Sequence, residues 1–194
     1  MKGIELKTER LILRTVRPAD AGGIFAYRSL PEVCKYQGRH ENVRKTRRII
    51  TLTNAVKPNT PMTWHQLAVL EKKSGRLVGD IGIHFKDKEN QQAELAYTLA
   101  PQYQGRGYAT EAALRVLAYL FGKLKKHRVA ATADPRNKGS VNVMKRIGMR
   151  KEGYFKKSFW TGKEWTDDVA YAVLREEREQ GGKGQPKQPA AAAG

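Results

Sequence analysis

The sequence predicts a mixed α/β fold in which an antiparallel meander is followed by alternating helices and strands. Three observations lead to this prediction. Strand-like runs separated by short turns fill residues 65–99. A helical pattern of apolar residues covers residues 107–124. Two strand-like runs near the end of the chain flank the turn at residues 161–163, as in a hairpin.

The elements up to the end of the meander follow from local signals. Residues 11–14 are predicted as a strand, and residues 18–28 as a helix with Asp20 as a candidate cap. Residues 31–57 are expected to be mostly helical. The three strands of the meander are predicted over residues 65–70, 76–85 and 93–99.

The elements after the meander alternate between helix and strand. Residues 107–124 form the strongest predicted helix, because its apolar residues recur on one face. A short buried strand over residues 129–132 precedes a helix over residues 137–147, which Gly148 ends with a left-handed cap. The predicted final strands cover residues 154–160 and 165–173.

The chain is long enough for one compact core, with 194 residues of which 40% are hydrophobic. Residues 179–194 contain no aromatic or branched apolar residue. We therefore expect a folded domain over residues 1–178 and a disordered low-complexity tail over residues 179–194.

Several classes of protein are disfavoured by composition. The single cysteine, Cys34, excludes an internal disulfide framework and a multi-cysteine zinc site. The four histidines show no metal-ligand spacing, so no metal is expected. No apolar run approaches ~18 residues and the first residues lack an apolar signal core, so we expect a cytoplasmic protein without a membrane span.

The loop between residues 99 and 108 carries the clearest chemical signal. Gly105 and Gly107 lie between a predicted strand and a predicted helix, so successive N–H groups can turn toward one anion beside the helix start. No lysine follows as in a P-loop, and Thr110 stands where a dinucleotide fingerprint needs Gly or Ala. A phosphate or pyrophosphate site fits this pattern. A tight connection without a ligand is the alternative.

This loop also resembles a known family. Residues 102–107 (Gln-Tyr-Gln-Gly-Arg-Gly) resemble the Gln/Arg-x-x-Gly-x-Gly/Ala loop of the GCN5-related N-acetyltransferases (GNAT), which holds the pyrophosphate of acetyl-CoA. Four further segments resemble the RimJ/RimL branch, whose members acetylate the N-termini of ribosomal proteins. They are residues 8–14, 93–97, 137–149 and 163–167.

The resemblance implies both a fold and an activity. The fold would be a central, mostly antiparallel twisted sheet of about seven strands with about four helices, splayed between strands 4 and 5. The activity would be acetyl transfer from acetyl-CoA to a primary amine by direct attack in a ternary complex. The acceptor implied by the branch is a protein N-terminal α-amine.

The resemblance also implies which residues hold the coenzyme. The backbone of Tyr97, Thr98 and Leu99 would pair with its pantetheine arm, and the amide of Asn137 would bind the same arm. Lys145 is a candidate for its 3′-phosphate, together with Arg136 and Lys138. The pyrophosphate would be held by Gln104, Gly105, Arg106, Gly107, Tyr108 and Ala109.

Two residues are candidates for catalysis by the same resemblance. Glu94 occupies the strand position where some members place a glutamate base, with a water chain as the alternative and Asp80 as a weaker rival. Met144 replaces the tyrosine with which many members protonate the thiolate. Ser140, one turn earlier, resembles the serine that this branch places near the sulfur, although it could instead satisfy backbone groups at the helix start. Tyr97 is expected to pack in the core.

The basic charge leaves the partners open. The formal net charge is +18, and residues 35–57 alone carry +6. One coenzyme does not account for this excess, so docking on RNA or the ribosome stands beside a merely solvated basic surface. A small-molecule acceptor, such as an antibiotic, polyamine or amino acid, is the alternative to a protein N-terminus. The expected assembly is a monomer or homodimer.

Overall fold

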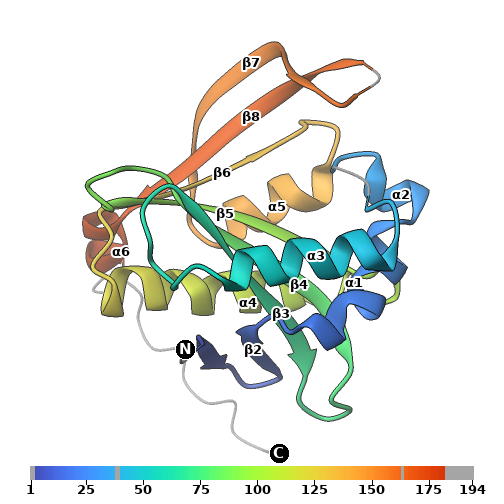
Figure 1. The fold of residues 1–194 in the computed structure, drawn as a ribbon. Coiled ribbons are helices and arrows are strands. Elements are labelled where there is room, and N and C mark those ends of the chain that lie inside the picture. Colours follow the sequence, from blue (N-terminus) through green and yellow to red (C-terminus); the bar gives the residue numbers. More distant parts are fainter. Residues whose placement is uncertain (1–2, 38–39, 163, 182–194) are drawn as a thin grey trace, which may run out of the picture.

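The computed structural model describes residues 3–37, 40–162 and 164–181. Eight strands form one sheet in the order β1-β2-β3-β4-β5-β6-β8-β7 (Figure 1). The strands are β1 (Glu5–Lys7), β2 (Leu11–Thr15), β3 (Thr63–Glu71), β4 (Leu77–Phe85), β5 (Gln92–Leu99), β6 (Arg128–Ala133), β7 (Arg150–Trp160) and β8 (Trp165–Leu174). The helices are α1 (Ala21–Arg28), α2 (Pro31–Cys34), α3 (Val43–Asn54), α4 (Tyr108–Ala118), α5 (Lys138–Arg146) and α6 (Arg175–Gly181).

The sheet opens between β5 and β6. All neighbouring strands are antiparallel except this pair, which is parallel and is paired only between Gln92–Glu94 and Arg128–Ala130. Residues 95–99 of β5 therefore have β4 on one side and no strand on the other. Because β1 was not among the predicted strands, β5 and β6 are the predicted strands 4 and 5, and the predicted splay between them is confirmed. The splay leaves backbone N–H and C=O groups of β5 free to bind a ligand.

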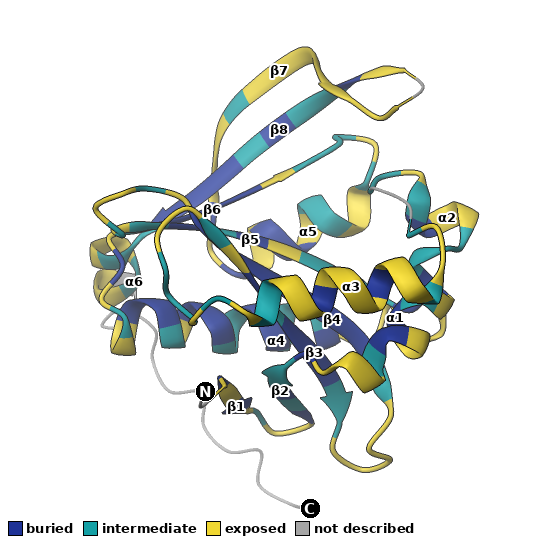
Figure 2. Cartoon of the chain, viewed as in Figure 1, coloured by how far each residue is buried: buried dark blue, intermediate teal, exposed yellow. Residues whose placement is uncertain are grey.

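Helices cover both faces of the sheet. α4 and α5 bury the larger apolar core, because every third or fourth residue of α4 is apolar and faces the strands. α1 and α3 cover the opposite face with a smaller core that includes Ala68 of β3 and Ile50 of α3. Figure 2 shows buried residues on each of these helices, with exposed residues on the outward side of α1, α3 and α5 and mostly half-buried ones on that of α4.

The mixed α/β fold is confirmed, but several predicted boundaries were wrong. β1 and α6 were not predicted, since each is short and lacks a clear apolar period. The predicted helix 31–57 is two helices, α2 and α3. The predicted helix 107–124 changes at Tyr119 into a wider π-helical turn, Tyr119–Lys123.

The prediction that Asp20 caps the first helix was wrong, because its side chain makes no capping hydrogen bond to α1. Its carboxylate instead accepts from the backbone N–H of Arg17 at 2.7 Å and pairs with Arg14 at 2.7 Å. Pro18 begins a separate 3-10 turn, Pro18–Asp20, which precedes α1. The Asp20 side chain therefore caps the start of this turn and not the start of α1.

The predicted tail lies mostly outside the described residues. Residues 179–181 complete α6, and residues 182–194 are not described. Within the described part of the chain, no helix is both long and apolar enough to cross a membrane.

Candidate functional site

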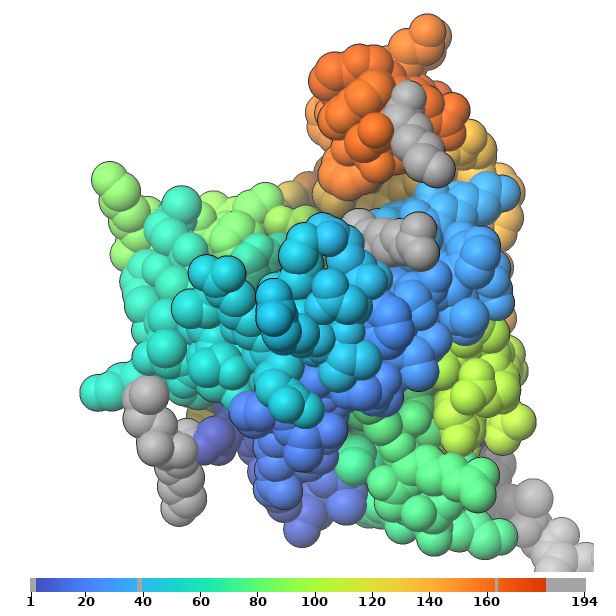
Figure 3. Space-filling view, turned by 45° about the vertical axis from the view of Figure 1, so that its right-hand side comes forward, coloured from blue at the N-terminus to red at the C-terminus, as the bar shows by residue number. Residues whose placement is uncertain are grey.

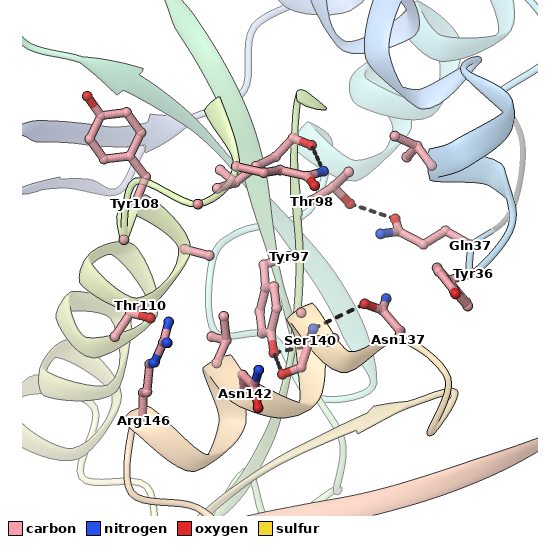
Figure 4. Close-up of a pocket in the computed structure, with 18 of the residues that line it drawn as sticks. Tyr36, Gln37, Tyr97, Thr98, Tyr108, Thr110, Asn137, Ser140, Asn142 and Arg146 are labelled. Atoms are coloured by element: carbon pink, nitrogen blue, oxygen red, sulfur yellow. Dashed lines mark hydrogen bonds between the residues drawn. The ribbon is translucent and has the colours of Figure 1, made fainter. Parts of the chain in front are cut away.

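A cavity of about 320 Å³ lies where the sheet opens. Its walls come from the end of β5, the loop before α4, one side of α5, and α2 with the residues that follow it (Figure 4). Ten residues predicted to bind the coenzyme or act in catalysis line it: Tyr97, Thr98, Leu99, Gln104, Gly105, Gly107, Tyr108, Ala109, Asn137 and Ser140. Glu94, Arg106 and Lys145 are not among its lining residues.

The glycine loop presents a row of free backbone donors to this cavity. Gly105 and Gly107 have φ of 74° and 78°, a backbone conformation that residues with a Cβ adopt only with strain. The N–H groups of residues 105–110 donate to no acceptor within the described residues, and α4 begins without a side-chain cap. Six unsatisfied donors at a helix start form a site for an anion such as a pyrophosphate.

Two arginine side chains, Arg10 and Arg106, pack against the glycine loop. The Arg10 guanidinium donates to the carbonyl of Arg106 at 3.0 Å and pairs with Glu111 of α4 at 2.6 Å. The Arg106 guanidinium lies over the ring of Tyr103, 5.5 Å from its centroid. The side chain of Arg106 therefore packs beside the cavity, while its backbone belongs to the row of donors.

Tyr97 and Ser140 form a hydroxyl pair between β5 and α5. The Tyr97 hydroxyl donates to the Ser140 carbonyl at 2.9 Å and accepts from Ser140 Oγ at 3.1 Å (Figure 4). Burial raises the pKa of Tyr97 to about 12. The phenol thus keeps its proton and orients the serine, a role beyond the core packing predicted for it.

Asn137 caps α5. Its side-chain oxygen accepts from the backbone N–H of Ser140 at 3.1 Å, which leaves the amide nitrogen as its donor toward the cavity. The Ser140 hydroxyl makes its hydrogen bond to Tyr97 and not to a backbone group. The side chain that satisfies a backbone N–H group at the start of α5 is therefore that of Asn137 and not that of Ser140.

Asp80 is fully buried and saturated with partners. It pairs with Arg28 at 2.5 Å and also accepts from Tyr27 and Gln66. Gln37 joins this network to the cavity, because its side-chain oxygen accepts from Arg28 at 3.2 Å and from Thr98 at 2.6 Å. Asp80 is thus the counter-charge of Arg28, and both of its carboxylate oxygens already accept hydrogen bonds, which disfavours it as the general base.

Glu94 lies on the sheet face that α1 and α3 only partly cover. Its carboxylate is 3.2 Å from the Lys86 ammonium and 3.9 Å from His84, whose ring stacks on Trp64. Asp168 of β8 is a neighbour that sequence reasoning missed: burial raises the pKa of Asp168, and the nearby charge of Glu94 raises it further. Two carboxylates therefore stand on the side of β5 opposite Tyr97 and α5.

Other lining residues were also missed. Arg146 lines the cavity and extends toward Thr110 (Figure 4), whereas the predicted Lys145 does not line it. Helical spacing could have found Arg146, since it lies seven residues, or about two turns, after Gly139 and four after Asn142, on the face of α5 that lines the cavity. Tyr36 and Gln37 had no signal, because only the tertiary fold brings them beside β5. The predicted Arg136 is held by Asp134 at 2.7 Å.

Comparison with known sequences agrees with this geometry. Residues 10–150 match the model of the acetyltransferase (GNAT) domain. An uncharacterized N-acetyltransferase of Bacillus subtilis, YnaD, is 33% identical over 174 residues, which is 90% of this chain and 99% of the relative. The alanine N-acetyltransferase of ribosomal protein uS5 from Escherichia coli is 33% identical over 79 residues, 41% of each chain.

Comparison with solved structures gives the same fold. A GNAT-family acetyltransferase from Bacillus anthracis superposes with a TM-score of 0.80 and 35% sequence identity. The match covers 89% of this chain and 99% of that one. The opened sheet and the glycine loop are thus placed in a fold of known architecture.

Proposed function

The chain belongs to the GNAT acetyltransferase family, and from that premise we propose that it acetylates the α-amine at the N-terminus of a protein. It is an N-acetyltransferase, and its fold uses acetyl-CoA. The protein acceptor is supported by the relative that acetylates a ribosomal protein.

The row of free N–H groups at residues 105–110 is the observation that carries the proposal. These donors would hold the pyrophosphate, and the unpaired edge of β5 at residues 95–99 would bind the pantetheine arm. Asn137 would donate its amide to that arm, while Arg146 is better placed than Lys145 for the adenosine phosphate. When bound, acetyl-CoA supplies a thioester carbonyl that an amine can attack.

Glu94 is the proposed general base. The amine must lose a proton as its nitrogen bonds to the acetyl carbon, and a carboxylate on the acceptor face can take that proton directly or through water. Lys86 and His84 lie beside the carboxylate on the face that α1 and α3 partly cover. Asp168, whose pKa is raised by burial and by the charge of Glu94, is a second carboxylate on this face.

Ser140 is the proposed proton donor to the thiolate. As the carbon–sulfur bond breaks, Ser140 Oγ–H would donate to the sulfur and would be reprotonated from solvent, so that one proton leaves the amine and one reaches the thiol. Tyr97 is a positioning residue in this scheme, because its own proton stays on the phenol and is donated to the Ser140 carbonyl. It accepts the Ser140 O–H hydrogen bond until that hydrogen turns toward the sulfur. The pair fixes the hydroxyl at the wall of the cavity.

The remaining features of the proposal concern the setting of the enzyme. We take residues 1–178 as the catalytic domain, acting without a metal in the cytoplasm, as a monomer or homodimer. The single cysteine and the absence of metal-ligand spacing among the histidines support this view.

A panel of acceptors tests the function. The full chain would be incubated with acetyl-CoA and with N-terminal peptides of ribosomal proteins, spermidine, an aminoglycoside and free amino acids, and products would be identified by mass spectrometry. We expect acetylation at the α-amine of at least one peptide. Acetylation of spermidine alone would overturn the protein acceptor while leaving the acetyltransferase chemistry intact.

A further inference from the structure

The outward face of α3 carries four cations in its first two turns. Arg44, Lys45, Arg47 and Arg48 are exposed, and the helix contains no acidic residue. Thr46 and Ile50 on the opposite side are buried against the body of the protein. In Figure 3 this helix, coloured cyan, lies in the middle of the face toward the viewer. The helix lines no part of the coenzyme cavity.

These arginines differ from most others in the molecule. Among the described residues, Arg44, Arg47 and Arg48 pair with no carboxylate, whereas Lys45 pairs with Glu41. Elsewhere in the described residues, seven arginines pair with a carboxylate: Arg10, Arg14, Arg28, Arg128, Arg136, Arg150 and Arg175. The positive charge of α3 is therefore left without an internal counter-charge.

This arrangement works against the stability of the helix. Arg44 and Arg48 are four residues apart and Arg44 and Arg47 are three apart, so like charges face one another at a cost of about 0.2–0.5 kcal/mol for each pair. The positive end of the helix dipole lies among the same side chains and adds to the repulsion. A solvated surface needs no such clustering, whereas an external polyanion would relieve it.

We propose that the Arg44–Arg47–Arg48 face of α3 docks the enzyme on the phosphate backbone of structured RNA. The guanidinium fork matches phosphate oxygens, and three of the four cations are arginines. A membrane is a poorer fit, because the apolar side of α3 is buried in the protein and only Ile49 and Leu52 are exposed beside the charges. The choice of RNA over other polyanions rests on the proposed function, since ribosomal-protein acceptors assemble on RNA.

Filter binding with an unmodified tRNA transcript tests the docking surface. The full chain and the R44Q/R47Q/R48Q variant would be titrated between 50 and 300 mM salt, with circular dichroism to verify folding. Glutamine keeps a high helix propensity. Loss of three phosphate contacts should reduce the slope of log affinity against log salt by about two to three, since each contact contributes ~0.7–0.9.

The matched control removes the same number of charges from other exposed sites, in the variant K73Q/K88Q/K123Q. It should bind tRNA within about twofold of the unchanged chain. Equal losses in both variants would show a diffuse charge effect and overturn the assignment to α3. So would α3-dependent binding to phosphatidylglycerol vesicles without binding to tRNA. Both variants should acetylate a free peptide at the unchanged rate, so a missing activity in all three proteins would count against the proposed function and not against docking.

Discussion

The two faces of the sheet are built differently. The face under α4 and α5 is an apolar layer in which β2, β3 and β4 contribute residues such as Leu13, Leu67 and Ile81, all nearly inaccessible to water. The opposite face carries Asp80, His84 and Glu94 on neighbouring strands, under a smaller apolar cluster. The cavity proposed to hold the coenzyme lies at the edge where the two faces meet, at the end of β5.

The difference separates two tasks. On the apolar side, the groups proposed to bind the ligand are main-chain donors and the Tyr97–Ser140 hydroxyl pair, which are fixed by packing. On the polar face, the groups are charged side chains that hold one another in pairs, such as Arg28 with Asp80 and Lys86 with Glu94. We therefore expect changes on the polar face to act through charge, and changes on the apolar face to act through geometry.

The largest effect is expected from the buried pair of the polar face. D80N would leave the Arg28 guanidinium buried without a counter-charge, and should lower the free energy of unfolding by about 3–5 kcal/mol in urea denaturation. E5Q, which breaks the exposed Glu5–Lys7 pair, should cost less than about 1 kcal/mol. Similar losses of unfolding free energy in D80N and E5Q would contradict the view that the polar face depends on its buried charge pair.

The apolar face has its own titratable group, His65. Burial lowers the pKa of His65 to about 4 from the ordinary 6.5. Above pH 6.5 both folded and unfolded states hold it neutral. As the pH falls from 6.5 to 4, the unfolded state alone binds the proton, so stability should fall by on the order of 3 kcal/mol or less.

Urea unfolding across this pH range checks the histidine. H65Q should flatten the loss between pH 6.5 and 4, whereas H127Q, at an exposed position, should leave it unchanged. A slope that persists in H65Q would assign acid sensitivity to the carboxylates of the polar face instead.

Glu94 tests whether the polar face performs the proton transfer. E94Q should lower kcat by about a hundredfold at neutral pH, because the amide does not accept the proton. Acetyl-CoA affinity, measured by calorimetry, should not change, since Glu94 does not line the cavity. E89Q serves as an exposed control. A fall below about tenfold would favour a water chain as the base.

Gly107 tests the geometry of the coenzyme loop. G107A would place a side chain at φ of 78°, at a cost of about 1–2 kcal/mol, and should weaken acetyl-CoA binding about tenfold in calorimetry. G122A is the matched control, because an added Cβ at Gly122 meets no atom within 4 Å and its φ is not positive. If both variants bind acetyl-CoA as the unchanged chain does, the loop only turns the backbone.

The hydroxyl pair is expected to give the smallest effect. Y97F and S140A should each lower kcat about tenfold with little change in the KM for acetyl-CoA, and the double variant should lose little more than either alone. Additive losses would mean that Tyr97 acts only through packing. Y119F provides a control at a half-buried tyrosine outside the cavity.

The order of the elements from β2 to β8 and the position of the glycine loop were predictable from the sequence. The spacing of Gly105 and Gly107 determines where the backbone can turn its N–H groups together, and this requirement is local. The helix of Ser140 and Asn137 was equally local, since its cap and its glycine stop lie within a dozen residues.

The contents of the site beyond that loop were decided only by the tertiary structure. Gln37 meets Thr98 across 61 positions, and Asp80 meets Arg28 across 52, so no local pattern encodes either contact. Charge alone pointed to Lys145, but the face of α5 turned toward the cavity carries Arg146. Local backbone preferences are written in short stretches of sequence, whereas the pairing of distant side chains depends on how the whole sheet and its helices pack.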